Sequence, residues 1–473
     1  MRRTIQIYYL FFAALLSVAG LIIAMILYID RNAEHYISHL YLLPLLYTCY
    51  TMGTMVLVKR MSGSISIFGI VGMYFLKDVL NPFFLMLGNY QIMTKNTEIF
   101  LYFDKAILLM IYETTCVYTL LIMSSASERR MKKRESSVKP GVLFRITISL
   151  MILLIGGILA VYPSLSGRFH TILEIGKPET YIPVRSWRVS GREPLGLVDT
   201  LMRAIFTLVQ IIFPAYFVVK IHNKYGRKHE ARAIAYMLLV DGCLFFVMTG
   251  ENANTVFAAV AVLIMICALY FERVRKYIPM IAAGGILFVI VALLGKGGAF
   301  AGENRNLLYE LSQIFNAYFG GVANVAAACL LKETSDQIYL AADFFRSVPF
   351  ISSFFSGMAG VSSVVAFNDV FWGFTGRSDQ LLPSVGQGAL YFGYICAPVI
   401  PCFFAMLTMK LEKMAKGTAN YYLKYFFYYV TFVMMLLLGG NNLTHFYRYA
   451  IRFGMVFLIM QTMSVKMPRE RSV

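Results

Sequence analysis

The chain has little charge. Asp, Glu, Lys and Arg make up only 14% of its 473 residues, whereas hydrophobic residues make up 59%. A water-soluble domain of this length could not bury so much apolar surface, so the composition excludes an ordinary soluble protein and predicts an integral membrane protein. Acidic residues are the scarcest of the charged ones, with 25 Asp and Glu against 43 Lys and Arg, which gives a net charge of +18.

Other absences exclude further classes of protein. The seven cysteines form no CxxC pair and fall mostly in apolar runs, so they predict neither a disulfide framework nor a metal site. The apolar–polar alternation that marks a transmembrane β-barrel is missing. No internal repeat and no low-complexity stretch stands out, so we expect one membrane domain over residues 1–473. The first apolar run is too long for the core of a signal peptide, and no small-residue cleavage site follows it.

Apolar runs of helix length recur along the chain. Each has roughly 17–25 residues, which an α-helix needs to cross ~30 Å of hydrocarbon, and a helix satisfies its own backbone hydrogen bonds in lipid. We therefore expect an all-α polytopic protein with about twelve transmembrane helices. The expected spans are Ile5–Ile29, His39–Val58, Ile65–Leu87, Ala106–Met123, Gly141–Tyr162, Val198–Val219, Ala233–Gly250, Thr255–Phe271, Tyr277–Leu294, Gly388–Met409, Tyr421–Leu438 and Tyr447–Val465.

The orientation follows from the positions of Lys and Arg, which collect in cytoplasmic loops. With twelve spans, the strongly basic segments all fall on one side, and both termini lie on that side. These segments are Arg2–Arg3, Lys59–Arg60, Arg129–Arg134 with Lys139, Lys220–Arg232, Arg273–Lys276, Lys410–Lys416 and Lys466–Arg471. The cytoplasmic loops account for most of the positive charge. The basic residues form no compact, aromatic-interleaved domain, so we do not expect nucleic-acid binding.

Two long polar loops are then external, Ser164–Leu197 and Gly295–Gln387. The first contains Arg185, Arg188 and Arg192, and external positive charge runs against the orientation rule. Guanidinium groups suit phosphate oxygens, including those of a lipid-linked pyrophosphate. Contact with anionic lipid headgroups or salt bridges to nearby glutamates is the alternative interpretation.

The second loop contains two apolar segments, Leu307–Leu331 and Phe344–Val365. Gly320–Gly321 interrupts the first, which we expect to be a re-entrant or surface-lying helix, because a further crossing would reverse every later basic loop. Aromatic rings beside carboxylates, amides and guanidiniums are typical of a sugar site, and the alternative is an interfacial aromatic belt with loop hydrogen bonds. The polar and aromatic residues are Lys296, Glu303, Asn304, Arg305, Tyr318, Asp343, Arg346, Asn368, Asp369, Trp372, Arg377, Asp379 and Gln380.

Charged residues inside expected spans need an explanation, because charge in lipid is costly. Lys77–Asp78 in the third span and Asp241 in the seventh favour a set of buried ion pairs that lock helices together. Arg448 and Arg452 lie on one face near the outer end of the last span, with His445 just outside. This group favours an anion clamp.

Residues 383–393 (PSVGQGALYFG) precede and enter a late apolar span after the large external loop. In this element and in its topology the chain resembles the bacterial Wzy-type oligosaccharide repeat-unit polymerases of O-antigen, capsule and exopolysaccharide synthesis. That family more often has an acidic residue where this chain has Gln387, which leaves a catalytic carboxylate at this position in doubt.

The resemblance implies a GT-C-like membrane glycosyltransferase that joins undecaprenyl-diphosphate-linked glycans, with no nucleotide sugar, cofactor or obligatory metal. The lack of a DxD pair or a His/Asp ligand cluster agrees with a metal-independent reaction. The resemblance also implies a chain-length regulator and a flippase as partners.

We assign the candidate residues to the following roles. Arg305, Arg377 and Arg448 neutralise the leaving diphosphate, and Asp379 is the base, ahead of Asp369, Glu303 and His445. Arg188 and Arg192 capture the lipid phosphate or the glycan. Tyr318, Gln387 and Tyr391 shape the sugar pocket, and His445 and Arg452 extend the substrate-binding group.

Two other functions remain open. A flippase or exporter of lipid-linked oligosaccharide is favoured by Lys77, Asp78 and Asp241 and disfavoured by the long external loop and the lack of two similar halves. A glycan ligase of the O-antigen type would share fold and chemistry with the polymerase.

Overall fold

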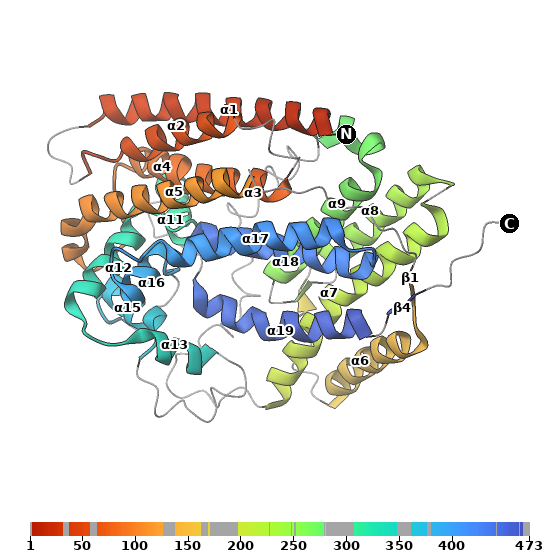
Figure 1. Cartoon of the computed structure of the whole chain (residues 1–473). Coiled ribbons are helices and arrows are strands. Elements are labelled where there is room, and N and C mark those ends of the chain that lie inside the picture. The colour runs from red at the N-terminus through yellow and green to blue at the C-terminus, as the bar shows by residue number, and fades with distance from the viewer. Residues whose placement is uncertain are drawn as a thin grey trace. The chain divides into compact units, whose positions relative to one another are not determined.

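The computed structural model describes residues 2–31, 37–56, 64–125, 138–161, 169–170, 197–226, 228–246, 248–249, 252–278, 280, 307–347, 361–375, 380–440, 442–462 and 464–466. This part of the chain is almost entirely helical, as expected, with four strands of two or three residues (Figure 1). The chain forms two compact units, each assembled from segments far apart in the sequence. The first unit contains Met1–Arg130, Lys296–Lys410 and Val433–Tyr449, and the second contains Met131–Gly295, Leu411–Phe432 and Ala450–Val473.

The amino-terminal helices of the first unit contact one another through buried hydroxyl groups, and the third helix continues through a π-helical turn into the fourth. The hydroxyl groups of Tyr9 and Thr54 are 2.6 Å apart between the first two helices. Ser64 begins the third helix by accepting a hydrogen bond from the backbone N–H of Ile67. The chain then passes through a π-helical turn without a break. In order, these elements are α1 (Arg2–Ile29), α2 (Leu42–Val56), α3 (Ile65–Tyr74), the π-helix η1 (Phe75–Leu80), α4 (Asn81–Leu87), the 3-10 helix η2 (Thr97–Tyr102) and α5 (Phe103–Ser125).

The rest of the first unit consists of shorter helices from the second half of the chain. They are α11 (Leu307–Tyr318), α12 (Val322–Thr334), α13 (Tyr339–Ser347), α15 (Ser363–Trp372) and α16 (Ser384–Phe392). Three longer helices follow and contribute to both units. They are α17 (Val399–Gly417), α18 (Tyr421–Gly440) and α19 (Leu443–Thr462).

The second unit places two of the expected cytoplasmic loops at the same end of its helices. Glu230, at the start of α8, pairs with Arg273, near the end of α9, at 3.2 Å. The basic segments 220–232 and 273–276 therefore share one end, as the charge pattern predicts. The elements are β1 (Val138–Pro140), α6 (Val142–Val161), β2 (Phe169–His170), α7 (Leu197–Tyr225), α8 (Glu230–Phe246), β3 (Met248–Thr249), α9 (Asn252–Val274), the 3-10 helix η5 (Arg275–Tyr277) and β4 (Ser464–Lys466). The antiparallel strand pairs are β1 with β4 and β2 with β3.

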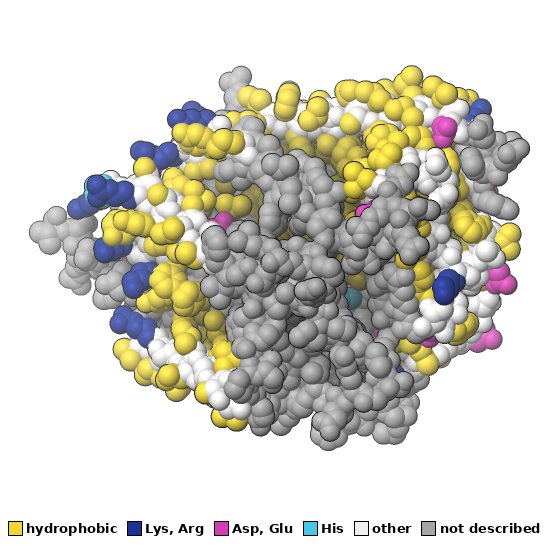
Figure 2. All heavy atoms as spheres, turned by 180° about the vertical axis from the view of Figure 1, so that it is seen from behind, with side chains coloured by type: hydrophobic (Ala, Val, Ile, Leu, Met, Phe, Trp, Pro, Cys, Tyr) yellow, Lys and Arg dark blue, Asp and Glu magenta, His cyan; other side chains and the backbone are white. Residues whose placement is uncertain are grey.

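Among the described residues, five helices are long and apolar enough to cross a membrane: Gln6–Ile29, Ile65–Leu87, Thr97–Ser124, Thr255–Tyr277 and Tyr421–Gly440. Apolar side chains cover much of the described surface in Figure 2. On α1, Phe11 is 71% exposed. Exposed apolar surface of this kind needs lipid around it. The chain is a membrane protein with a helical membrane domain.

Not every expected span is a full crossing in this structure. The regions expected to span at His39–Val58, Gly141–Tyr162, Val198–Val219, Ala233–Gly250 and Tyr447–Val465 are helical, as α2, α6, α7, α8 and α19. Their described residues fall short of the length or the apolar content of a span. Most of the expected span Tyr277–Leu294 lies outside the described residues.

The break expected at Gly320–Gly321 is confirmed. Gly320 has a φ of +59°, a left-handed conformation that suits glycine, and α11 and α12 are bent by 49° across it. The pair is therefore a sixth candidate span, broken in the middle, or a re-entrant loop. The alternative of a surface-lying helix is wrong for α12, because residues 322–331 are all buried within the first unit.

The expectation of one continuous helix over Gly388–Met409 is wrong. Gly393, with a φ of +78°, ends α16, and α17 begins only at Val399. The apolar run hides this break because no charged residue marks it. At Gly388 the turn before α17 approaches α16 so closely that an added Cβ atom would overlap the carbonyl oxygen of Ala397.

This contact predicts the outcome of a substitution. Gly388→Ala should lower the free energy of unfolding by about 1–3 kcal/mol, because the new methyl group meets backbone that cannot move aside. Gly53→Ala is the matched control: Gly53 also lies within a helix, and nothing lies within 4 Å of its added Cβ atom. Thermal unfolding of both variants in detergent measures the difference. Equal midpoints would contradict the close approach of α16 to the turn at Ala397.

Candidate functional site

Four helices of the first unit meet at the buried carboxyl group of Asp343. Asp343 lies on α13, and its side chain is not exposed at all. Helix α15 begins at Ser363, after Ser362 accepts a hydrogen bond from the backbone N–H of Val365. Helix α16 begins after Pro383, which needs no hydrogen bond for its nitrogen at this position. The start of α19 completes the group.

The Asp343 carboxyl group accepts hydrogen bonds from two of these helices. Its Oδ1 accepts from the backbone N–H of Ser363 at 2.8 Å. Its Oδ2 accepts from the hydroxyl groups of Ser363 and Tyr391 and, at 3.3 Å, from Nε2 of Gln387. Burial raises the pKa of Asp343, and the hydrogen bonds from Ser363, Tyr391 and Gln387 oppose this effect. We call Asp343, Ser363, Gln387, Tyr391 and Thr444 the Asp343 cluster.

Gln387 connects α16 to α19 through both ends of its amide. Its Nε2 donates to Thr444 Oγ1 at 3.0 Å, and its Oε1 accepts from the backbone N–H of Leu443 at 2.6 Å. Gln387 also lies 2.8 Å from the Tyr391 hydroxyl. A carboxylate at position 387 could accept from Leu443 but could not donate to Asp343. This need for a donor gives a physical reason for a glutamine at position 387.

The first two turns of α19 carry aromatic, imidazole and cationic side chains, and the aromatic one contacts α13 next to Asp343. The rings of Phe344 on α13 and Tyr447 on α19 are 5.4 Å apart, and Tyr447 interacts electrostatically with Asp343. Arg448 is the next residue, and its charge acts on His445. His445 Nδ1 lies 3.2 Å from Oδ1 of Asn442. Arg346 follows Asp343 by one turn of α13 and is exposed.

The structure brings together part of the predicted site. Gln387 and Tyr391 belong to the Asp343 cluster, and His445 and Arg448 lie on the adjoining turn of α19. Arg452 lies one turn further along α19. Tyr318 ends α11, where its carbonyl oxygen faces Gly440. The predicted residues Arg188, Arg192, Arg305, Arg377 and Asp379 lie outside the described residues.

Asn316 and Asn324 fill the bend between α11 and α12 with buried amide groups. Nδ2 of Asn316 donates to Oδ1 of Asn324 at 2.8 Å, and Nδ2 of Asn324 donates to the carbonyl oxygen of Leu381 at 3.0 Å. Asn442, at the start of α19, donates in the same way to Leu382 at 3.2 Å. The segment that precedes α16 is therefore held from both sides, which fixes the position of Gln387 and Tyr391.

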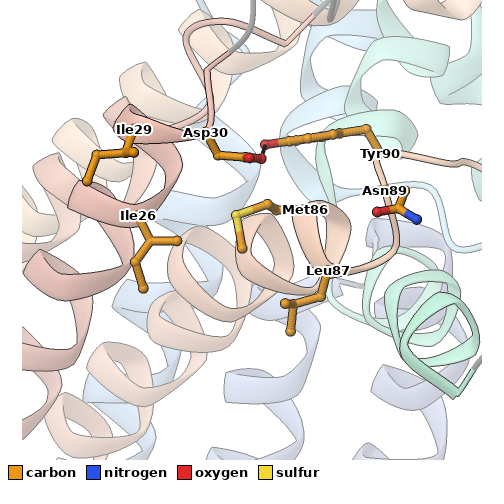
Figure 3. Close-up of a pocket in the computed structure, with 7 residues that line it drawn as sticks. All are labelled: Ile26, Ile29, Asp30, Met86, Leu87, Asn89 and Tyr90. Atoms are coloured by element: carbon orange, nitrogen blue, oxygen red, sulfur yellow. Dashed lines mark hydrogen bonds between the residues drawn. The ribbon is translucent and has the colours of Figure 1, made fainter.

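A cavity of about 770 Å³ lies between the ends of α1 and α4 (Figure 3). Apolar side chains form one part of its lining, and the polar residues Asp30, Asn89 and Tyr90 form the other. The Tyr90 hydroxyl donates to Oδ2 of Asp30 at 2.7 Å. Burial and the neighbouring carboxylate raise the pKa of Tyr90, so its hydroxyl stays protonated. The apolar lining residues are Ile26, Ile29, Met86 and Leu87.

The turn beside this cavity has an unusual backbone. Asn89 and Tyr90 have φ angles of 54° and 55°, in the left-handed region that residues other than glycine rarely adopt. Contacts with distant helices hold the following residues. Gln313 on α11 accepts from the backbone N–H of Met93 and donates to the carbonyl oxygen of Gln91, both at 2.8 Å. A strained backbone conformation that contacts from other helices hold in place is typical of functional positions.

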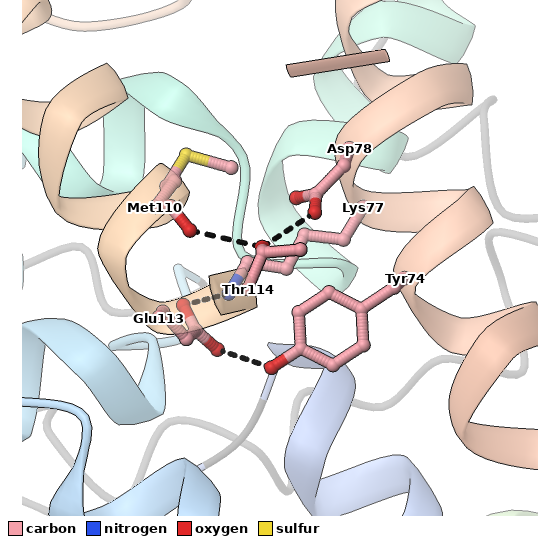
Figure 4. A network of polar contacts seen from close by, with 6 residues as sticks. All are labelled: Tyr74, Lys77, Asp78, Met110, Glu113 and Thr114. Atoms are coloured by element: carbon pink, nitrogen blue, oxygen red, sulfur yellow. Dashed lines mark hydrogen bonds and ion pairs between the residues drawn. The ribbon is translucent and has the colours of Figure 1, made fainter. Parts of the chain in front are cut away.

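A separate cluster of charged residues lies between η1 and α5 (Figure 4). Lys77 Nζ and Glu113 Oε2 are 2.5 Å apart, and both side chains are buried. Tyr74 donates to Glu113 at 3.0 Å, and the hydroxyl oxygen of Thr114 lies 2.7 Å from Oδ2 of Asp78. The expected buried ion pair at Lys77 is confirmed, but its partner is Glu113, and Asp241 belongs to the other unit.

Comparisons of the chain with protein-family models, with curated proteins and with solved structures find no match. Among the described residues, no three His, Cys, Asp or Glu side chains are grouped so that they could hold a metal ion.

Sequence reasoning placed Asp343 in the polar loop but did not identify it as the centre of the site. Its partners Ser363 and Thr444 carry no signal of their own, because single hydroxyl residues are common in apolar segments. The usable signal was a lone Asp beside aromatic residues on a short amphipathic helix.

The geometry predicts a strong dependence of stability on the acceptor oxygens of Asp343. Asp343→Ala leaves the buried donors of Ser363, Tyr391 and Gln387 without their acceptor and should cost about 3 kcal/mol or more. Asp343→Asn should cost much less, because the amide keeps one acceptor and the hydroxyl groups can turn to accept. Asp336→Ala, at an exposed aspartate, is the control. Unfolding midpoints that fall equally for the Ala and Asn variants would contradict this arrangement.

Proposed function

We propose that this protein is a glycosyltransferase that polymerises undecaprenyl-diphosphate-linked oligosaccharide repeat units at the outer face of the bacterial plasma membrane. In this proposal it is a GT-C-like protein with about twelve spans and with both termini in the cytoplasm. The helical membrane domain, with five or six described span candidates, is compatible with this architecture.

The observation that carries the proposal is the Asp343 cluster. Gln387 and Tyr391 come from the element that resembles the polymerases, and both donate hydrogen bonds to the one carboxyl group at the centre of the cluster. The cluster adjoins Arg448 and His445 on α19. Arg448 follows Thr444 of the cluster by one turn of α19. The transfer of a glycosyl group from a diphosphate requires a proton acceptor and a cationic group for the leaving diphosphate.

The proposed reaction needs no change in oxidation state. A hydroxyl oxygen of the incoming repeat unit attacks the anomeric carbon of the growing glycan and forms the new glycosidic bond. The bond from that carbon to the lipid diphosphate breaks, and its electron pair leaves on the diphosphate oxygen. The hydroxyl proton passes to the Tyr391 oxygen while the Tyr391 proton passes to Asp343, which thus acts through Tyr391 as a positioning residue.

Guanidinium groups neutralise the departing diphosphate in this proposal. Arg448 is the described candidate, and Arg305 and Arg377 are the further candidates from the external loop. Asp379 remains an alternative base, and Arg188 and Arg192 remain candidates for capture of the lipid phosphate. The raised pKa of Asp343 favours its role as the final proton acceptor.

The cavity between α1 and α4 supports the handling of an amphiphilic substrate. Its apolar lining suits an isoprenoid chain, and the carboxylate of Asp30 and the amide of Asn89 suit sugar hydroxyl groups. Because Asp30 is negatively charged, this cavity suits the glycan end of a carrier better than its diphosphate.

A flippase for the same lipid-linked glycans is the second candidate function. The buried ionisable residues Lys77, Asp78 and Glu113 favour it, since intramembrane ionisable residues mark transport pathways. The Lys77–Glu113 pair joins two packed helices, however, which is also what a structural ion pair does. A ligase that moves finished polymer to another acceptor would use the same chemistry as the polymerase.

The proposal predicts how two substitutions affect chain lengthening. With purified protein and a lipid-diphosphate oligosaccharide, with and without chelator, the unchanged protein should produce a ladder of longer products. Tyr391→Phe should lower the rate about 100-fold or more because the proton relay is lost, and Arg448→Ala should do the same because the leaving diphosphate is no longer neutralised.

Arg232→Ala, which removes an exposed arginine of α8, should leave the ladder unchanged. A full ladder from either site variant would remove that residue from the mechanism. Translocation across vesicles without lengthening would replace the polymerase with the flippase, and transfer only to a non-carrier acceptor would replace it with the ligase.

A further inference from the structure

The π-helical turn η1 places two consecutive charged residues, Lys77 and Asp78, inside the first unit. Both are buried, with exposed fractions of 1% and 0%. Helix α5 supplies one carboxylate opposite them, that of Glu113, which is also fully buried. If all three groups were ionised, the cluster would carry one excess negative charge away from water. A buried charge without a counter-charge is too costly to persist.

Glu113 has the partners that an ionised carboxylate requires. Its Oε2 lies 2.5 Å from the ammonium group of Lys77, and its Oε1 accepts from the Tyr74 hydroxyl at 3.0 Å. Both oxygens are therefore satisfied, and the charges of Lys77 and Glu113 cancel. The excess charge must be assigned to Asp78.

Asp78 lacks the partners that an ionised carboxylate requires. Its Oδ1 is buried and has no hydrogen-bond partner among the described residues. Its Oδ2 lies 2.7 Å from the hydroxyl oxygen of Thr114, which also lies 2.9 Å from the carbonyl oxygen of Met110 (Figure 4). The Thr114 hydroxyl has one hydrogen, so it cannot donate fully to both acceptors.

A proton on Asp78 removes the excess negative charge, and it also removes the competition of two acceptors for the single hydrogen of the Thr114 hydroxyl. The carboxylic acid then donates to the oxygen of Thr114, and the Thr114 hydroxyl donates to Met110. The cluster becomes neutral, with one ion pair and one neutral acid. The titratable groups that face Asp78 are Lys77, Tyr74, Glu113, Tyr47 from α2 and Tyr118 from α5. Lys77 is the only cation among them, and Glu113 already pairs with it.

We propose that the cluster of Lys77, Asp78, Glu113 and Thr114 is a proton-binding site, in which Asp78 holds one proton beside the ionised Lys77–Glu113 pair. The ligand is a proton and not a metal ion, because Asp78 offers a carboxyl group and one shared hydroxyl where a cation would need several oxygens. This site is independent of the glycosyl transfer proposed above, and its test requires no glycan.

Infrared spectroscopy of the full-length protein in lipid tests the assignment. The spectrum should contain the carbonyl band of a buried neutral carboxylic acid, with the frequency shift in D₂O that marks an acid proton. The difference spectrum between the unchanged protein and Asp78→Asn should contain this band, because other buried acids cancel in the subtraction. The difference spectrum for Asp104→Asn, at an exposed aspartate of α5, should lack it. A difference spectrum for Asp78→Asn without the band would overturn the proposal.

Thermal unfolding provides a second, independent measurement. Asp78→Asn should keep the unfolding midpoint close to that of the unchanged protein, because the amide imitates a neutral acid. Glu113→Gln should lower the midpoint strongly, because it leaves the Lys77 charge buried without its counter-charge. Equal losses in both variants would indicate that Asp78 is ionised. A rise of the midpoint with sodium that Asp78→Asn abolishes would assign the site to a metal cation instead.

Discussion

Every polar group that this protein buries in its membrane domain needs a partner from the protein itself, because lipid offers none. The amide side chains satisfy this need at the helix breaks. Asn316 and Asn324 bond to each other across the bend of α11 and α12, and Asn442 and Gln387 bond to backbone groups at the starts of α16 and α19. Helices can therefore end inside the first unit, which is what allows side chains to converge there on a carboxyl group.

Asp343 and Asp78, two buried aspartates of the first unit, illustrate opposite solutions to the same cost. Asp343 is surrounded by donors from α15 and α16, and their hydrogen bonds oppose the rise in its pKa that burial causes. Asp78 faces one hydroxyl group that it shares with a backbone carbonyl. A carboxyl group rich in donors suits the acceptance of a proton during a reaction, whereas one poor in donors suits the storage of a proton.

The sequence predicted what depends on composition and local pattern, and it missed what depends on contacts between distant segments. Apolar runs predicted the helices, and the glycine pair predicted the bend at Gly320. The break at Gly393 was missed because an apolar run reads the same whether its helix is continuous or interrupted. Glu113 was missed as the partner of Lys77 because nothing in an apolar run shows which other helix it faces. Asp343 can be identified as the centre of the candidate site only from the packing of α13, α15 and α16.

The left-handed turn at Asn89 and Tyr90 bears on how the protein is assembled. Local preference does not favour this backbone, and the residues that follow it are held by Gln313 of α11 and by the carbonyl oxygen of Phe371 on α15. These partners are synthesised more than 200 residues after the turn. During biogenesis the early helices therefore enter the bilayer before this turn has its partners. The cavity beside the turn acquires its final form only after the carboxy-terminal half has been synthesised.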